Sequence, residues 1–127
     1  MSRPKKRICA LVVDDNIDVA ESFARLLIAL GCEAAYVTDP HKALKEAERL
    51  KPHIAFLDIG MPEIDGYQLA QALRRRFGEE LKVVAVTAYA AVQDRRAARR
   101  AGFDAHVSKP IDIAVVESII KTVLPNY

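Results

Sequence analysis

The sequence lacks the features of a membrane-spanning or nucleic-acid-binding chain. No apolar run approaches the roughly 20 residues that a membrane helix needs. The run after the basic start, residues 8–13, is short and ends at Asp14-Asp15, so it is not typical of a signal peptide. The net charge of +2 is too small to indicate a nucleic acid or membrane partner. We therefore expect a cytoplasmic protein whose domain contacts neither a nucleic acid nor a membrane.

Metal-thiolate and nucleotide motifs are also missing. Cys9 and Cys32 are far apart and have no CxxC spacing, so we expect two reduced, packed thiols. The histidines have no metal-ligand spacing, which argues against a zinc site; they are His41, His53 and His106. No GxxxxGK[ST] or GxGxxG follows the first apolar run, which argues against a bound nucleotide.

What is present is an alternation of two periodicities. The 127 residues predict one domain, 1–127, with a basic lead-in over residues 1–7. Short β-rich runs cover 8–13, 33–37, 54–57, 81–86 and 105–107. Helical spacing covers 19–30, 40–50, 66–77, 93–101 and 115–124, with Asp39 expected to cap the second helix and Pro40 to start it. Five βα units predict an α/β fold with a doubly wound, flavodoxin-like parallel sheet of order 2-1-3-4-5, a (βα)5 three-layer sandwich.

Polar residues follow the ends of these strands. Because parallel strands end at one edge of the sheet, these residues should converge; they are Asp14, Asp15, Asp58, Thr87 and Lys109. At about 4 Å and an effective dielectric near 20, two carboxylates repel by about 4 kcal/mol, so the acids require another cation or raised pKa values. Oxygen ligands without imidazole or thiolate favour Mg²⁺. A lysine and a hydroxyl at the same edge suit a phosphoryl group, and the lack of a nucleotide motif points to transfer onto the protein.

Four motifs in this order resemble the receiver domains of two-component response regulators, the CheY-like domains. The resemblance covers nearly the whole chain. The motifs are VVDDN at 12–16, LDIGMPEIDGY at 57–67, VTAYA at 86–90 and AGFDAHVSKPID at 101–112. LDIGMP and FDAHVSKPID are most similar to receivers of hybrid sensor histidine kinases.

The resemblance implies that Asp58 accepts a phosphoryl group from a histidine kinase or a phosphotransfer protein. It implies a Mg²⁺ ion, replaceable by Mn²⁺, with the ligands Asp15, Asp58, the backbone carbonyl of Gly60 and, through water, Asp14. The groups expected at the phosphoryl oxygens are Thr87, Lys109 and the backbone of Ala88. The peptide bond before Pro110 is expected to be cis.

The expectations about downstream signalling depend on the same resemblance. A downstream target is expected at the face formed by the fourth helix, fifth strand and fifth helix. His106 stands where many receivers carry Tyr or Phe, and two interpretations stay open: a switching side chain with some pH sensitivity, or a residue of the rim with no switching role. Gly60 and Tyr89 are expected to tune dephosphorylation.

Two arginine clusters have less specific interpretations. The first cluster consists of Arg95, Arg96, Arg99 and Arg100. Its first interpretation is a solvated helix face, its second is a docking site for a partner protein, and its third is a nucleic-acid contact. Arg74 to Arg76 are first explained by the dipole of the third helix.

Three functions are compatible with these residues. The first is a phospho-accepting switch with no separate turnover substrate, either free-standing or part of a hybrid kinase. The second is a Mg²⁺-dependent phosphatase that forms an aspartyl phosphate, but Gly60 stands where the second acid of its DxD motif belongs. The third is a degenerate receiver that serves only as an interaction module, although all five expected site residues are present.

Overall fold

Five short parallel strands form the centre of this computed structural model, which describes residues 7–60, 66–88 and 102–127. The strands are β1 (Cys9–Val13), β2 (Glu33–Val37), β3 (Ile54–Asp58), β4 (Lys82–Thr87) and β5 (Ala105–Ser108). The helices are α1 (Ile17–Ala29), α2 (Ala43–Leu50), α3 (Gly66–Phe77) and α5 (Ile113–Val123). Single 3₁₀ turns cover Pro40–Lys42 and Gly78–Glu80. The predicted helix over 93–101 and its arginines lie outside the described residues. Among the described helices, none is long and apolar enough to cross a membrane.

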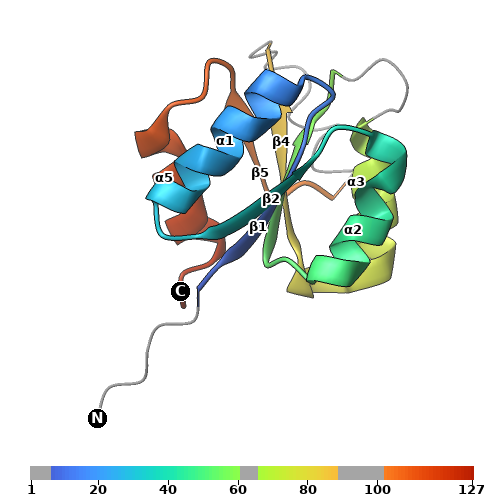
Figure 1. Cartoon of the computed structure of the whole chain (residues 1–127). Coiled ribbons are helices and arrows are strands. Elements are labelled where there is room, and N and C mark those ends of the chain that lie inside the picture. Colours follow the sequence, from blue (N-terminus) through green and yellow to red (C-terminus); the bar gives the residue numbers. More distant parts are fainter. Residues whose placement is uncertain (1–6, 61–65, 89–101) are drawn as a thin grey trace.

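The strand order is β2-β1-β3-β4-β5, which confirms the predicted doubly wound sheet. The order reverses between β1 and β3, where Val13 pairs with Leu57. Figure 1 shows α1 and α5 on one face of the sheet and α2 and α3 on the other. Because both faces are covered, the central strands are apolar on both sides, as the continuous apolar runs predicted. The carboxyl ends of β1 and β3 are therefore neighbours.

β3 is the most deeply buried strand, and every one of its residues is buried. Phe56 packs against Phe23 of α1 with ring centroids 4.8 Å apart. Leu57 lies in the opposite core with Leu11 and Leu73. Close packing on both faces leaves this strand little freedom to shift. Asp58, its last residue, is therefore held by a rigid element.

The second helix begins differently from the prediction. Asp39 does act as a cap, because its Oδ1 accepts a hydrogen bond of 3.0 Å from the backbone N–H of His41. The turn that it caps is a 3₁₀ turn, closed by a 3.0 Å bond from the N–H of Lys42 to the carbonyl of Asp39. α2 begins only at Ala43, because the tighter i→i+3 bonding takes up the first turn.

Arg74, near the end of α3, has a larger role than the helix dipole. Its guanidinium donates to the carbonyl oxygens of Gly78, Leu81 and Gly102 at 2.6, 2.9 and 2.7 Å. It also donates to the carboxylate of Asp104 at 2.7 Å. The same carboxylate oxygen accepts the N–H of Val83 at 2.8 Å. Arg74 thus joins the end of α3 to the starts of β4 and β5, at the sheet edge opposite the site.

We expect Arg74→Ala to lower the free energy of unfolding by at least about 2 kcal/mol, because it leaves half-buried acceptors without their donor. Arg75→Ala is the matched control, since Arg75 is exposed, and should change the value by no more than about 0.5 kcal/mol. Chemical denaturation measures both. Equal effects of the two substitutions would contradict the role of the Arg74 network.

Candidate functional site

The turn after β1 separates two consecutive acids. The N–H of Asp14 continues the sheet by donating to the carbonyl of Val37 at 3.1 Å. Its side chain is buried and accepts the N–H of Asn16 at 2.9 Å. Asp15 is exposed, and Asn16 caps α1 by accepting from the N–H groups of Asp18 and Val19. The turn therefore holds Asp14 inward while Asp15 lies at the surface.

Asp58 reaches the same place from β3. Its side chain is buried, and its Oδ1 accepts the N–H of Gly60 at 2.8 Å. A Cβ on Gly60 would lie 3.3 Å from that oxygen, so a larger residue would press on the carboxylate. Gly66 is a second constraint, since a Cβ there would lie 2.7 Å from the Cα of Ile59. Only glycine lets the start of α3 come this close to the residue after Asp58.

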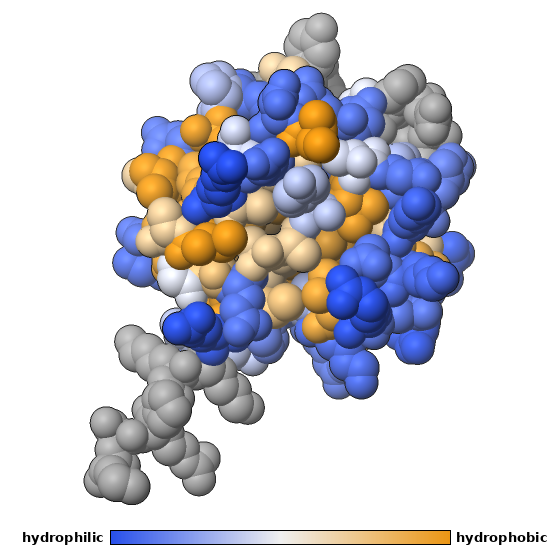
Figure 2. Space-filling view, viewed as in Figure 1, coloured by the Kyte–Doolittle hydropathy of each residue, from blue (hydrophilic) through white to orange (hydrophobic). Residues whose placement is uncertain are grey.

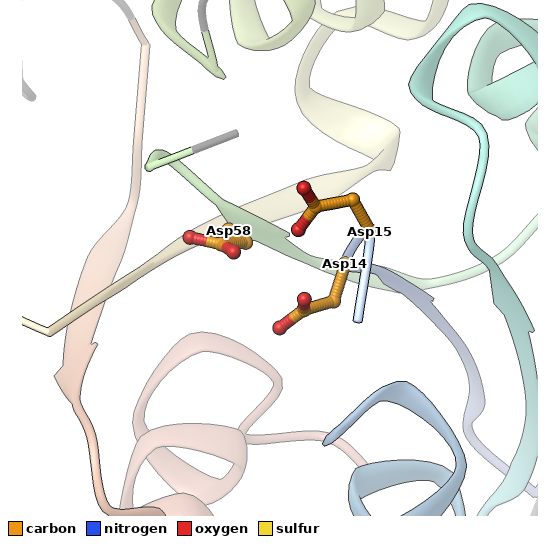
Figure 3. Close-up of side chains that lie close together, drawn as sticks. All are labelled: Asp14, Asp15 and Asp58. Carbon is orange, nitrogen blue, oxygen red and sulfur yellow. The ribbon is translucent and has the colours of Figure 1, made fainter. Parts of the chain in front are cut away.

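The three acids converge at one point. Asp14, Asp15 and Asp58 each offer a carboxylate oxygen, and these oxygens lie within 4.8 Å of one another. Figure 3 shows the three side chains gathered at the neighbouring ends of β1 and β3. At such distances carboxylates repel strongly unless a cation lies among them. The convergence predicted from the strand ends is therefore present for the three acids.

Lys109 supplies one positive charge to this cluster. Its Nζ lies 3.0 Å from Oδ2 of Asp14 and 3.4 Å from Oδ2 of Asp58. Burial lowers the pKa of the Lys109 ammonium, but the hydrogen bonds and charges of Asp14 and Asp58 raise it by more, so the pKa lies above its ordinary value. One ammonium against three carboxylates leaves a formal charge of −2, opposite to that of one divalent cation.

The remaining predicted residues lie on or beside β4 and β5. Thr87 ends β4, and its carbonyl accepts the N–H of Lys109 at 2.8 Å. Ala88 follows it and is exposed. The peptide bond between Lys109 and Pro110 is cis. His106 lies exposed in β5, paired in register with Ala85. Tyr89 lies outside the described residues.

Comparison with known proteins agrees with this arrangement. The family model described as response regulator receiver domain matches residues 10–121. The chain belongs to this family. A solved receiver domain from Methylobacillus flagellatus, described as CheY-like, is 32% identical, covers 93% of this chain and 99% of its own, and has a TM-score of 0.83. A putative response regulator from Chloroflexus aurantiacus is 26% identical and covers 94% and 99% of the two chains, with a TM-score of 0.86.

Curated relatives place this receiver domain among proteins of different lengths. The transcriptional regulatory protein PrrA of Mycobacterium tuberculosis is 37% identical over 90% of this chain, which spans only 48% of PrrA. A 14.6 kDa protein of Leptolyngbya boryana is 38% identical and covers 80% of this chain and 79% of its own. Hybrid signal transduction histidine kinase D of Dictyostelium discoideum also matches, at 28% identity over 92% of this chain and 8% of its own. Hybrid kinases are thus among the relatives, at lower identity than PrrA.

Two residues that position this receiver site, Asn16 and Gly66, are not identified by the motifs and periodicities alone. An Asn directly before a helical pattern is a signal for an N-cap, which is the role of Asn16. Gly66 begins α3. A glycine inside a helical pattern often has a packing cause, but the contact with Ile59 depends on the tertiary structure.

The raised pKa of Lys109 predicts a pH dependence. The folded protein holds the lysine proton at pH values where the unfolded chain releases it, so stability falls as pH rises from about 10.4 through the folded-state pKa. Below about 10.4 the contribution is fully present. We expect Lys109→Met to lack this alkaline loss, measured as the free energy of unfolding against pH. Lys121→Met, at an exposed position of α5, should retain the alkaline loss of stability. An identical alkaline loss in the protein and in Lys109→Met would contradict the ion pairs.

Proposed function

We propose that Asp58 of this receiver domain accepts a phosphoryl group from the phosphohistidine of a histidine kinase or phosphotransfer protein. The observation that carries the proposal is the convergence of three carboxylates within 4.8 Å of one another, with Lys109 beside Asp14 and Asp58. Membership of the receiver family supports it. In this proposal the domain is a signalling switch with no separate turnover substrate.

The donor set suits a Mg²⁺ ion, or Mn²⁺ in its place. The three described acids offer carboxylate oxygens, and Gly60 would add a carbonyl oxygen; a hard cation prefers both. Asp15 and Asp58 would hold the ion with the backbone carbonyl of Gly60, and Asp14 would act through water. When bound, the ion would supply positive charge for the incoming phosphoryl oxygens. Its charge would offset the excess of −2 in the cluster.

The chain's own residues account for the rest of the transfer. A carboxylate oxygen of Asp58 attacks phosphorus and forms the new P–O bond as the P–N bond to the donor imidazole breaks. The electron pair of that bond stays on the imidazole, which takes up a proton. Lys109 and the hydroxyl of Thr87 bind phosphoryl oxygens with the backbone of Ala88, so catalysis rests on positioning and charge. β3 holds the attacking oxygen because its residues are all buried.

The output follows from added charge. The phosphoryl group carries about −1.5 to −2, and Asp58 loses its own −1, so the tip of β3 gains about −0.5 to −1 on oxygens close enough to draw Lys109 and Thr87 towards them. We propose that a target protein reads this change on a face that includes β5 and α5, which the predicted helix over 93–101, outside the described residues, is expected to complete. Ile113 and Val115 on α5 are large apolar residues left 48% and 45% exposed, which is consistent with such a face. Gly60 and Tyr89 are proposed to set the lifetime of the phosphoryl group, and His106 stays open as a switch or a rim residue.

The alternatives have less support from the residues. A phosphatase of the DxD type needs a second acid two residues after the nucleophile, and Gly60 has no side chain to provide it. A degenerate receiver would lack part of the cluster, whereas the three acids and Lys109 are together. Two forms of the switch are compatible with these residues, a free-standing regulator and a receiver of a hybrid kinase. The native size of the protein in a cell extract separates these two.

Incubation with acetyl phosphate and Mg²⁺ tests the phospho-acceptor. We expect one phosphate adduct by intact mass, absent in Asp58→Ala and absent when EDTA removes the metal. Asp39→Ala is the matched control, because Asp39 also follows a strand but only caps a turn. Its adduct should form as in the unchanged protein. No adduct at all, or an adduct that persists in Asp58→Ala, would contradict the proposal.

If Asp15 binds Mg²⁺, the substitution Asp15→Asn should have opposite effects on stability with and without the metal. Without Mg²⁺ the substitution removes repulsion within the cluster, so we expect equal or greater stability. Mg²⁺ at about 100 times its Kd should stabilise the unchanged protein by about 2.7 kcal/mol and Asp15→Asn far less. Asp18→Asn, on the exposed first turn of α1, is the control and should keep the full gain. Thermal unfolding with and without Mg²⁺ measures these effects, and an equal gain in all three proteins would exclude Asp15 as a ligand.

A further inference from the structure

The exposed side of α1 carries an ordered set of four residues. Ile17 and Ile28 are each 56% exposed, unusually open for large apolar side chains. Between them Glu21 and Arg25 form an exposed ion pair of 2.6 Å. Spacings of four, four and three residues place all four on one side of a helix. We call Ile17, Glu21, Arg25 and Ile28 the α1 stripe.

The stripe is not part of the core of this domain. α1 packs on the sheet through a buried side that adjoins the stripe and consists of Ala20, Phe23, Ala24 and Leu27. Figure 2 views the molecule with α1 towards the reader and shows hydrophobic residues interrupted by hydrophilic ones over this helix. Isolated exposed apolar residues are common, but these two flank an ion pair on the same helical face. The order of the four residues is therefore a more specific sign of a binding surface than the exposure of the two isoleucines alone.

The α1 stripe is complementary to a second copy of itself that runs in the opposite direction. From the amino end it runs apolar, acidic, basic, apolar. Against an antiparallel second copy, Ile17 faces Ile28 and Glu21 faces Arg25 of the other helix. The centres of these two pairings differ by half a residue, or about 0.8 Å along the axis, which side chains easily span. In a parallel arrangement Glu21 would face Glu21 and Arg25 would face Arg25, and like charges would repel.

We propose that α1 is a self-association surface, on which a second copy of this chain docks antiparallel through the α1 stripe. A two-fold axis through the middle of the helix makes the same patch serve both copies. Stable interfaces bury at least about 1,200 Å² of accessible surface, and a single pair of short helices buries less. We therefore expect a weak dimer that forms and dissociates readily. This surface is separate from the proposed output face on β5 and α5. The inference does not depend on phosphorylation.

Charge reversal tests the antiparallel pairing. Glu21→Arg makes the stripe wholly basic and Arg25→Glu makes it wholly acidic, so each variant alone repels its own copy. We expect the Kd for self-association to rise about tenfold or more in each. A mixture of the two variants should associate, because a basic stripe then faces an acidic one. The double variant Glu21→Arg/Arg25→Glu should associate as the unchanged protein does, since its order is again complementary.

Sedimentation velocity over protein concentrations up to about 1 mM measures these associations. Glu46→Arg is the matched control, because it breaks an exposed ion pair with Arg49 on α2 and should leave association unchanged. Circular dichroism confirms that each variant is folded. An unchanged protein that stays monomeric throughout would overturn the proposal. So would single variants that associate undiminished, or a mixture of the two that does not associate, since another occupant of α1 would not require this complementarity.

Discussion

The repulsion among three carboxylates is the constraint on which the rest of this structure depends. Asp14, Asp15 and Asp58 offer oxygens within 4.8 Å of one another, where each pair repels by a few kcal/mol at the effective dielectric of a protein surface. Such a cluster persists only if the surrounding structure fixes it. β1 and β3 do so, because they are adjacent, parallel and buried on both faces. Lys109, which follows β5, offsets part of this repulsion, and a divalent cation would offset the negative charge that remains.

The two edges of the sheet differ in their roles: the edge at which the strands begin is structural, and the edge at which they end carries the charged cluster. At the amino edge, Arg74 and Asp104 saturate backbone groups from α3, β4 and β5 and carry little free charge. At the carboxyl edge, the acids and Lys109 keep an unbalanced charge beside exposed residues. An anchored edge opposite the site limits how far β5 can shift, and hence how far Lys109 can move.

Most of the fold and of the site could be predicted from the sequence, for physical reasons. Continuous apolar runs between amphipathic helices define a parallel sheet, and parallel strands bring their ends to one edge. Asp14, Asp58 and Lys109 followed from that rule alone. Residues whose role depends on distant contacts did not follow. Arg74 looked like a helix-end charge because its acceptors, such as the carbonyl of Gly102, are far away in the sequence. Gly66 and the 3₁₀ turn before α2 also depend on packing or local hydrogen bonds that periodicity does not report.

In the proposed function, the buried strand β3 presents Asp58 as the nucleophile of this site. The most direct measurement is borohydride reduction of the protein after treatment with acetyl phosphate and Mg²⁺, followed by peptide mass mapping. Borohydride reduces an acyl phosphate to an alcohol, so a phosphorylated aspartate is converted to homoserine. We expect homoserine at position 58 and at no other acid of the cluster. Homoserine at position 14 or 15, or phosphate retained on a hydroxyl or an imidazole, would contradict it.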